Sequence, residues 1–166
     1  MRVLVAIPVF AILAMLQSTI FSRLSILHGS ADLIMVVVIA WSLQERIAQP
    51  WWWAAIGLIF ASLMTAMPFV AVAIPYLVIV FTALMIKRRV WQSPLLIMMG
   101  TTIVATLIQH LTFYIAMALK GVLSSVSIVE TQITLPSALL NLLIALPVYL
   151  FVRELVRALY SDEEMT

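Results

Sequence analysis

The residues from Trp51 to Ile86 form an almost unbroken apolar run, and this run restricts the chain to very few folds. One helical crossing of a bilayer needs about 20 apolar residues. The run is close to twice that length, so we expect it to fold back on itself as a helical hairpin that turns near Ala66–Pro68. This hairpin predicts one membrane span over residues 51–65 and a second over residues 69–86.

The rest of the chain has the same character. Apolar residues make up 65% of the 166 residues and charged residues only 10%, whereas soluble domains carry about 45–50% and about 25%. Backbone polar groups in lipid must be satisfied within the chain, and no segment alternates in polarity as a membrane strand does. We therefore predict an all-α integral membrane protein, a six-transmembrane-helix bundle that forms a single domain over residues 1–166. The predicted spans are 3–21, 31–43, 51–65, 69–86, 95–119 and 135–152, followed by a tail over 153–166.

The basic residues predict the orientation of these spans. Seven of the nine Lys and Arg residues fall on the side that holds both predicted chain ends, and two fall on the other side. Positive residues are retained in the cytoplasm, so we expect both termini to be cytoplasmic in an inner membrane. The seven are Arg2, Arg46, Lys87, Arg88, Arg89, Arg153 and Arg157, and the two are Arg23 and Lys120. All five tryptophans, Trp41, Trp51, Trp52, Trp53 and Trp91, fall at the same cytoplasmic boundary, where an aromatic belt is expected.

The second predicted span is unusually short and opens with two polar residues, Ser30 and Asp32. Ser30 is placed to cap its first turn. A carboxylate beside helix N-terminal amides is favourable for structural reasons alone. However, ionisable groups at membrane depth are also the usual functional candidates, because their burial is costly without a partner. Asp32 is therefore either a structural residue or a contact for a partner or ligand.

Gln109 and His110 form the strongly polar pair of the fifth predicted span, with Thr102 and Thr106 at helical spacing on the same face. We expect this face to point into the bundle. A lone His without a second ligand at suitable spacing makes a poor metal site. An interhelical hydrogen bond is therefore the favoured interpretation of His110.

The last predicted span carries a stripe of small and polar residues spaced four apart: Ser137, Asn141, Ala145 and Tyr149. Stripes of this kind let helices approach closely and exchange hydrogen bonds in lipid. The stripe therefore indicates either helix packing within the chain or an interface with a membrane partner, and the sequence leaves both open.

Other classes of function are disfavoured by what the chain lacks. The sequence offers no nucleophile and base pair, no intramembrane carboxylate pair and no glycine-rich phosphate loop, so we expect no enzyme activity, catalytic residue, metal or cofactor. The net charge is only +2 and the cations are unevenly placed, which argues against nucleic-acid binding.

Two segments resemble a known family, the bacterial rod shape-determining protein MreD. The first is the opening of the short second span, Asp32-Leu33-Ile34-Met35. The second is the stretch from Leu135 to Leu150, which holds an Asn followed by a Pro and leads to a positively charged exit. One position departs from the family pattern. Members commonly carry an Asp four residues after a Gly in the third span, and here Gly57 is followed at that distance by Ala61, so no role of that Asp carries over.

The resemblance implies a non-enzymatic scaffold subunit of the cell-elongation machinery that directs peptidoglycan synthesis in rod-shaped bacteria. Its direct partner would be the bitopic protein MreC, and its indirect partners would be MreB and the synthase formed by RodA and its transpeptidase. A homodimer is left open. The partner helix would pack on the Ser137 stripe, and the segment from Gly121 to Thr134 would meet a periplasmic domain.

The resemblance also implies a fold similar to the substrate-binding component of energy-coupling-factor vitamin transporters. A transport subunit of that kind is the alternative function. It would need a pocket open to the outside with convergent polar groups. Asp32, His110, Tyr114 and Glu130 would supply some of those groups.

Overall fold

The computed structural model describes residues 3–21, 29–87, 94–122 and 130–160. Within these ranges the regular elements are all helical, and no strand is present. The helices are α1 (Ala6–Leu16), α2 (Leu33–Ser42), α3 (Trp51–Leu63), α4 (Phe69–Lys87), α5 (Pro94–Leu119) and α7 (Leu135–Leu159). Two π-helical turns, η1 (Gln17–Phe21) and η2 (Glu130–Thr134), follow α1 and precede α7. The all-α class predicted from the sequence is therefore found.

Three of the helices are long and apolar enough to cross a membrane: Phe69–Ile86, Pro94–Leu119 and Gln132–Leu159. The other three are apolar but shorter, at Ala6–Thr19, Leu33–Ser42 and Trp51–Leu63. A helix of 10 residues, such as α2, is about 15 Å long, which is half of the hydrocarbon thickness of a bilayer. The lengths indicate a membrane protein with three full-length candidate spans, fewer than the six predicted from the sequence.

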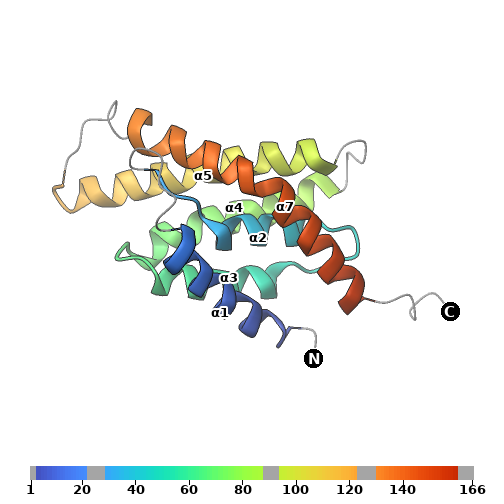
Figure 1. Ribbon diagram of the computed structural model, residues 1–166. Coiled ribbons are helices and arrows are strands. Elements are labelled where there is room, and N and C mark those ends of the chain that lie inside the picture. The colour runs from blue at the N-terminus through green and yellow to red at the C-terminus, as the bar shows by residue number, and fades with distance from the viewer. Residues whose placement is uncertain (1–2, 22–28, 88–93, 123–129, 161–166) are drawn as a thin grey trace.

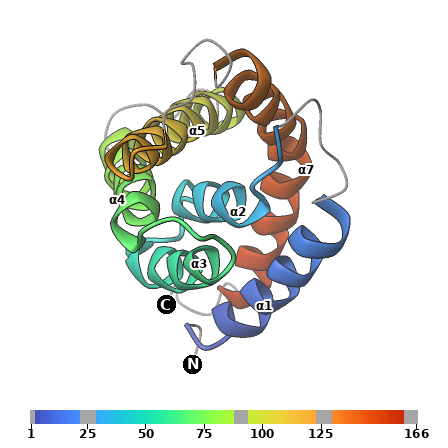
Figure 2. The same cartoon turned by 90° about the vertical axis from the view of Figure 1, so that its left-hand side faces the viewer.

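Helix α2 forms the centre of the bundle. All of its residues from Leu33 to Ser42 are buried, and it contacts α1, α3, α4, α5 and α7. Figure 2 looks along the bundle and shows α2 surrounded by these helices. A helix that is apolar on every side suits either a protein core or lipid. The sequence of α2 is apolar from Leu33 to Trp41, and in this structure the other helices cover it.

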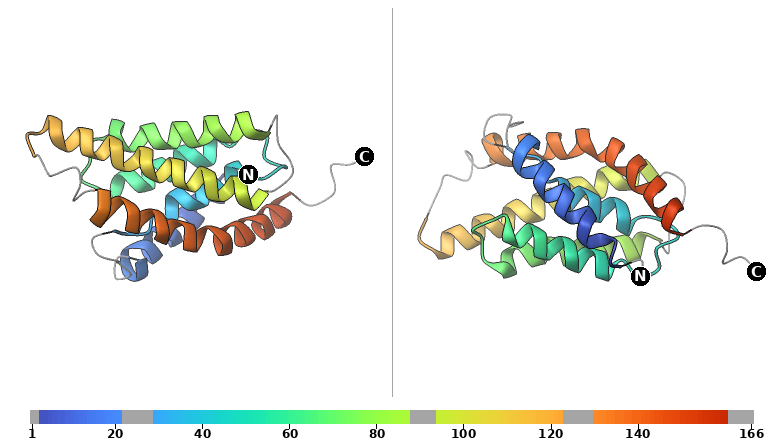
Figure 3. Two further views of the ribbon diagram at one scale, coloured as in Figure 1. Left: turned by 90° about the horizontal axis from the view of Figure 1, so that it is seen from above. Right: turned by 60° about the horizontal axis from the view of Figure 1, so that its bottom comes forward.

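The surrounding helices are neighbours in a fixed order. Contacts join α1 to α3, α3 to α4, α4 to α5 and α5 to α7, and Figure 3 shows the long helices α4, α5 and α7 running along the bundle. Their outward side chains are large and apolar, including Phe81, Leu96 and Leu143. Apolar surface of this extent is typical of a surface that faces lipid or a membrane partner.

Both ends of the described chain lie toward the same end of the bundle, together with the connection between α2 and α3 (Figure 1). A hydrogen bond joins the α2–α3 connection to the end of α7, since Arg46 Nη1 donates to the carbonyl oxygen of Tyr160 at 2.6 Å. Arg153 and Arg157 lie in the last turns of α7 at that end. Of the other predicted topology markers, Arg2, Arg23, Arg88, Arg89 and Trp91 lie outside the described residues.

Two of the tryptophans depart from the expected aromatic belt. Trp41 and Trp53 are 1% and 3% exposed, and their rings stack with centroids 3.5 Å apart and planes inclined by 12°. They belong to the core because each lies on a face that packs against a neighbouring helix. Among the tryptophans of the described ranges, Trp51 and Trp52 are exposed on the surface, as belt residues are.

Gly57 sets the distance between three helices. A Cβ atom at this position would lie 2.7 Å from Val38 Cγ2 and 3.1 Å from the Phe10 ring, so α1, α2 and α3 can approach this closely only around a glycine. Small residues at helix contacts are a usual device in membrane bundles. The packing of α2 against α3 therefore depends on residue 57 having no side chain.

Candidate functional site

Helix α2 begins inside the bundle, so the backbone N–H groups of its first turn are buried there. The first backbone N–H groups of a helix have no partner within the helix, and the chain before α2, from Gly29 to Asp32, is not helical. Where water is excluded, each of these groups needs a protein partner. Polar side chains are therefore expected to gather around the N-terminus of α2, and they do.

Two side chains cap the first turn of α2. Asp32 is the N-cap residue, and its Oδ1 accepts a hydrogen bond from the Met35 N–H at 3.0 Å. Gln17 Oε1 accepts from the Ile34 N–H at 3.1 Å, and the π-helical turn that begins at Gln17 holds this side chain at the end of α1. The cap predicted at Ser30 is thus made by Asp32, which lies directly before the helix.

Helix α7 pairs with the non-helical chain before α2. Asn141 Oδ1 accepts from the Asp32 N–H at 2.7 Å, and Ser137 Oγ accepts from the Ser30 N–H at 3.1 Å. This close approach requires Gly29, where a Cβ atom would lie 2.6 Å from the backbone nitrogen of Ser137. The polar side chains of α7 therefore satisfy backbone groups that α2 cannot.

Helix α5 completes the network. Gln109 Nε2 donates to Asp32 Oδ2 at 2.7 Å, and Asn141 Nδ2 donates to Thr106 Oγ1 at 3.0 Å. Thr106 Oγ1 in turn donates to the Thr102 carbonyl oxygen at 2.8 Å. Gln109, Thr106 and Asn141 are all buried. One continuous chain of hydrogen bonds thus joins α2, α5 and α7.

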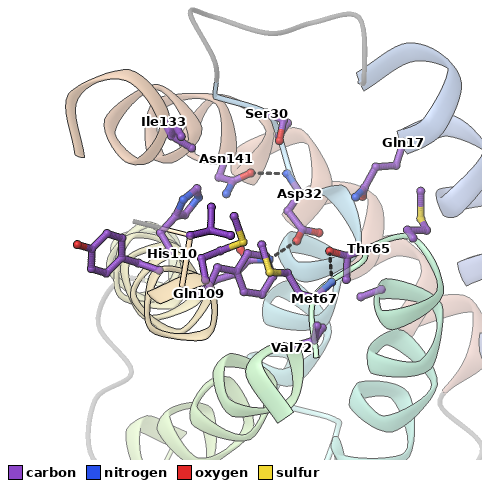
Figure 4. Close-up of a pocket in the computed structure, with 17 residues that line it drawn as sticks. Gln17, Ser30, Asp32, Thr65, Met67, Val72, Gln109, His110, Ile133 and Asn141 are labelled. Carbon is purple, nitrogen blue, oxygen red and sulfur yellow. Dashed lines mark hydrogen bonds between the residues drawn. The ribbon is translucent and has the colours of Figure 1, made fainter. Parts of the chain in front are cut away.

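The network borders a cavity of about 390 Å³, which we call the α2 cavity. Its walls come from Gln17, the chain directly before α2, the end of α3, the α3–α4 turn, α4, α5, η2 and α7. Figure 4 shows Asp32, Asn141, Gln109 and His110 grouped at the cavity, with Gln109 hydrogen-bonded to Asp32. Met64, at the end of α3, also lines it and is itself 38% exposed.

The structure brings five of the predicted site residues together. Asp32, Gln109, His110 and Asn141 line the α2 cavity, and Ser137 belongs to the same network. The interhelical hydrogen bond expected at His110 is made by Gln109, whereas His110 has no hydrogen-bond partner among the described residues. Asp32 is a structural cap and at the same time lines a cavity.

The stripe on α7 faces inward. Ser137, Asn141 and Ala145 are each 1% exposed and Tyr149 is 9% exposed. Ala145 and Tyr149 lie farther along α7, away from the α2 cavity, and pack into the core. Of the two interpretations of the stripe, burial thus matches packing within the chain, and a partner helix cannot reach these side chains in this structure.

Gln17 and Thr65 line the α2 cavity and were not among the residues singled out from the sequence. Gln17 carried a usable signal, since it is a polar residue inside an apolar span. Tyr114, expected in the pocket of a transport subunit, does line the cavity. The side chain of Glu130 lies outside the described part of the chain.

Comparisons with protein-family models, with characterised proteins and with solved structures found no match to this chain. The likeness to MreD and to the transporter component therefore stays a prediction from the sequence. Within the described ranges, no group of three His, Cys, Asp or Glu residues lies close enough to hold a metal ion. The chemistry that the site offers is hydrogen bonding and the charge of one carboxylate.

Proposed function

We propose that the chain is a non-enzymatic scaffold subunit of the bacterial cell-elongation machinery, similar to MreD, which binds MreC in the inner membrane. The observation that carries this proposal is the hydrogen bond from the Asp32 N–H to Asn141 Oδ1. It joins the two segments that resemble the family, 32–35 and 135–150, into one unit. Segments that resemble a family and are far apart in sequence are expected to meet if they specify a common architecture.

The proposal includes six passages of the chain through the bundle with both ends in the cytoplasm. The short helices do not argue against it, because non-helical backbone at membrane depth is tolerated where protein surrounds it. The segment before α2 fits that condition, since Ser137 and Asn141 accept its N–H groups. The bond between Arg46 and Tyr160 supports placing the α2–α3 connection and the end of α7 on one side.

The burial of the α7 stripe changes where MreC would bind. Its transmembrane helix would pack on the outward apolar faces of the surrounding helices, where side chains such as Leu96 and Leu143 are exposed. In membranes such contacts are stabilised by close packing instead of by the hydrophobic effect. The proposed scaffold binds its partner through its outer surfaces, and the α7 stripe packs α7 against the interior of the bundle.

Co-purification tests this proposal. The tagged chain is co-expressed with MreC of a rod-shaped bacterium, extracted in mild detergent and recovered by its tag, with an unrelated tagged membrane protein as control. We expect MreC to be enriched with the chain and absent from the control. We also expect the chain to restore rod shape to cells depleted of their own MreD. Recovery of MreC at the control level, with round cells, would contradict the scaffold function.

The α2 cavity favours a second candidate, the substrate-binding subunit of an energy-coupling-factor type vitamin transporter. Its volume of about 390 Å³ lies within the range of about 300–1,000 Å³ that small-molecule sites occupy. Native mass spectrometry of the protein released from detergent separates the two candidates. A retained vitamin would favour transport, and a retained bitopic protein would favour the scaffold.

A further inference from the structure

We propose that the α2 cavity binds a small organic cation, with its charged end on the Asp32 carboxylate and its apolar part against the Met and aromatic side chains of the α3–α4 turn and α5. This ligand site is additional to the scaffold function and does not depend on it. A protein that binds MreC through its outer surface could hold such a ligand in its interior.

The charge of the cavity is the first argument. Asp32 is the acidic residue among the described residues that line it, and no Lys or Arg lines it alongside. The carboxylate accepts hydrogen bonds from a backbone amide and from the Gln109 side-chain amide, and both of these donors are neutral. The carboxylate therefore has no positively charged group beside it in the described cavity lining, and a cation placed close to it would favour its charged form. Its two oxygens accept about four hydrogen bonds in total, which leaves room for an ammonium group.

The polarity of the helix end is the second argument. The N-terminus of a helix usually attracts anions, because its free N–H groups and its dipole are both positive. Here the Ile34 and Met35 N–H groups already donate to Gln17 and Asp32. The Asp32 carboxylate thus already occupies the position that an anion would take at the N-terminus of α2. The side of this carboxylate that faces the cavity favours a positively charged ligand.

The remaining wall suits the apolar part of a cation. Met64, Met67 and Met117 line the cavity with Phe113 and Tyr114. Aromatic faces attract organic cations through the ring quadrupole, and Met side chains adapt their shape to irregular ligands. His110, which lines the same wall without a hydrogen-bond partner in the described structure, is available to a polar group of the ligand.

Three probes of similar size and different charge test the proposal: 2-phenylethylammonium, the neutral 2-phenylethanol and the anion 3-phenylpropionate. Each is titrated by calorimetry into the full chain in phosphatidylcholine nanodiscs, and the heat measured with empty nanodiscs is subtracted. We expect the cation to bind at least about tenfold more tightly than the neutral probe, since a hydrogen bond to a charged group contributes that much. We expect no binding of the anion. Equal affinity for all three probes would overturn the proposal.

Three variants locate the site. Asp32→Asn keeps an oxygen that can cap the Met35 N–H, and it should abolish the preference for the cation. Ala61→Phe places a ring in the cavity, because Ala61 lines it, and should abolish binding of every probe. Glu45→Gln removes an exposed acid away from the cavity and should bind as the parent chain does. A thermal melt of each variant shows whether it folds.

If Asp32→Asn unfolds, Ala61→Phe still decides the question. Binding by a folded Ala61→Phe at the parent affinity, or a cation preference that survives Asp32→Asn, would show that the cation binds elsewhere or in the lipid. Recovery of MreC by the same variants is measured separately. Loss of cation binding with MreC retained would separate the ligand site from the scaffold function.

Discussion

The two ends of helix α2 are both buried, but they are held by different forces. At the N-terminal end, backbone and side-chain polar groups are joined in a hydrogen-bonded network through Asp32, Gln109 and Asn141. At the C-terminal end, the rings of Trp41 and Trp53 stack, and their indole N–H groups have no hydrogen-bond partner in the described structure. The N-terminal end is specified by hydrogen bonds between helices. The C-terminal end has a local hydrogen bond, from Gln44 Nε2 to the Ala40 carbonyl oxygen at 3.1 Å, and packs against α3 through the shape of the stacked rings.

This difference predicts different tolerance to substitution. A polar network must be completely satisfied, since each buried group without a partner costs about 1–3 kcal/mol. An aromatic stack loses only the contacts that a smaller ring cannot make. Substitutions at the N-terminal end of α2 should therefore be more destabilising than substitutions of similar size at its C-terminal end.

The largest effect is expected for Asn141→Leu. The change leaves the Asp32 N–H without an acceptor and removes the donor to Thr106 Oγ1, so the free energy of unfolding should fall by about 2–4 kcal/mol. Reversible unfolding in mixed detergent micelles measures it. Leu143→Ala is the matched control, because Leu143 is on the same helix and is 73% exposed. An equal loss in both variants would show that the network does not hold α2.

A smaller loss is expected between the two ends, where Gly57 faces α2. Gly57→Ala would place a Cβ atom 2.7 Å from Val38 Cγ2, and overpacking of this kind costs about 1–3 kcal/mol. Gly100→Ala is the control, since a Cβ atom there meets nothing within 4 Å, and it should stabilise the helix by up to about 1 kcal/mol. The two alanine variants should thus shift the unfolding midpoint in opposite directions. A shift of the same sign in both would contradict the close contact of α2 with α3.

The positions of the helices were readable from the sequence, whereas their inner faces were not. The predicted segments 69–86 and 95–119 correspond closely to α4 (Phe69–Lys87) and α5 (Pro94–Leu119), because apolar length and the residues Pro68 and Pro94 mark their limits. In a membrane protein, hydrophobicity does not distinguish the helix face that points into the core from the face that points into lipid. Lipid is as apolar as a protein core, so an apolar side chain such as Trp41 gives no sign of which way it points.

Polar residues were the exception, because they indicated much of the candidate site from the sequence alone. Asn141 and Gln109 stand out in apolar spans. Gln109 was expected to point into the bundle, whereas for Asn141 both packing within the chain and a partner interface were left open. The sequence could not show that they meet at Asp32, since this requires knowing that α2 is the central helix. Ala61 and Met64 line the cavity without any polar signal, so only the arrangement of the helices reveals them.

At the aromatic end a moderate effect is expected for Trp53→Phe. The smaller ring keeps part of the stack on Trp41 and leaves a gap, and it also removes an indole N–H that has no partner in the described structure. The free energy of unfolding should fall by about 1–2 kcal/mol, less than for Asn141→Leu. The same unfolding titration compares the two. A loss larger than that of Asn141→Leu would reverse the ranking of the two ends.

The smallest effect is expected for Tyr76→Phe, which tests whether burial of a polar atom is enough to make it important. Tyr76 is 2% exposed and its hydroxyl has no hydrogen-bond partner in the described structure. Removing a buried hydroxyl without a partner while keeping the ring should leave the free energy of unfolding within about 0.5 kcal/mol of the parent or raise it. Gln109→Leu, in which Asp32 Oδ2 loses a donor, is the comparison and should be clearly destabilising. If Tyr76→Phe were as destabilising as Gln109→Leu, the Tyr76 hydroxyl would have to bind a group such as an internal water, and the polar network would extend from Asp32 into α4.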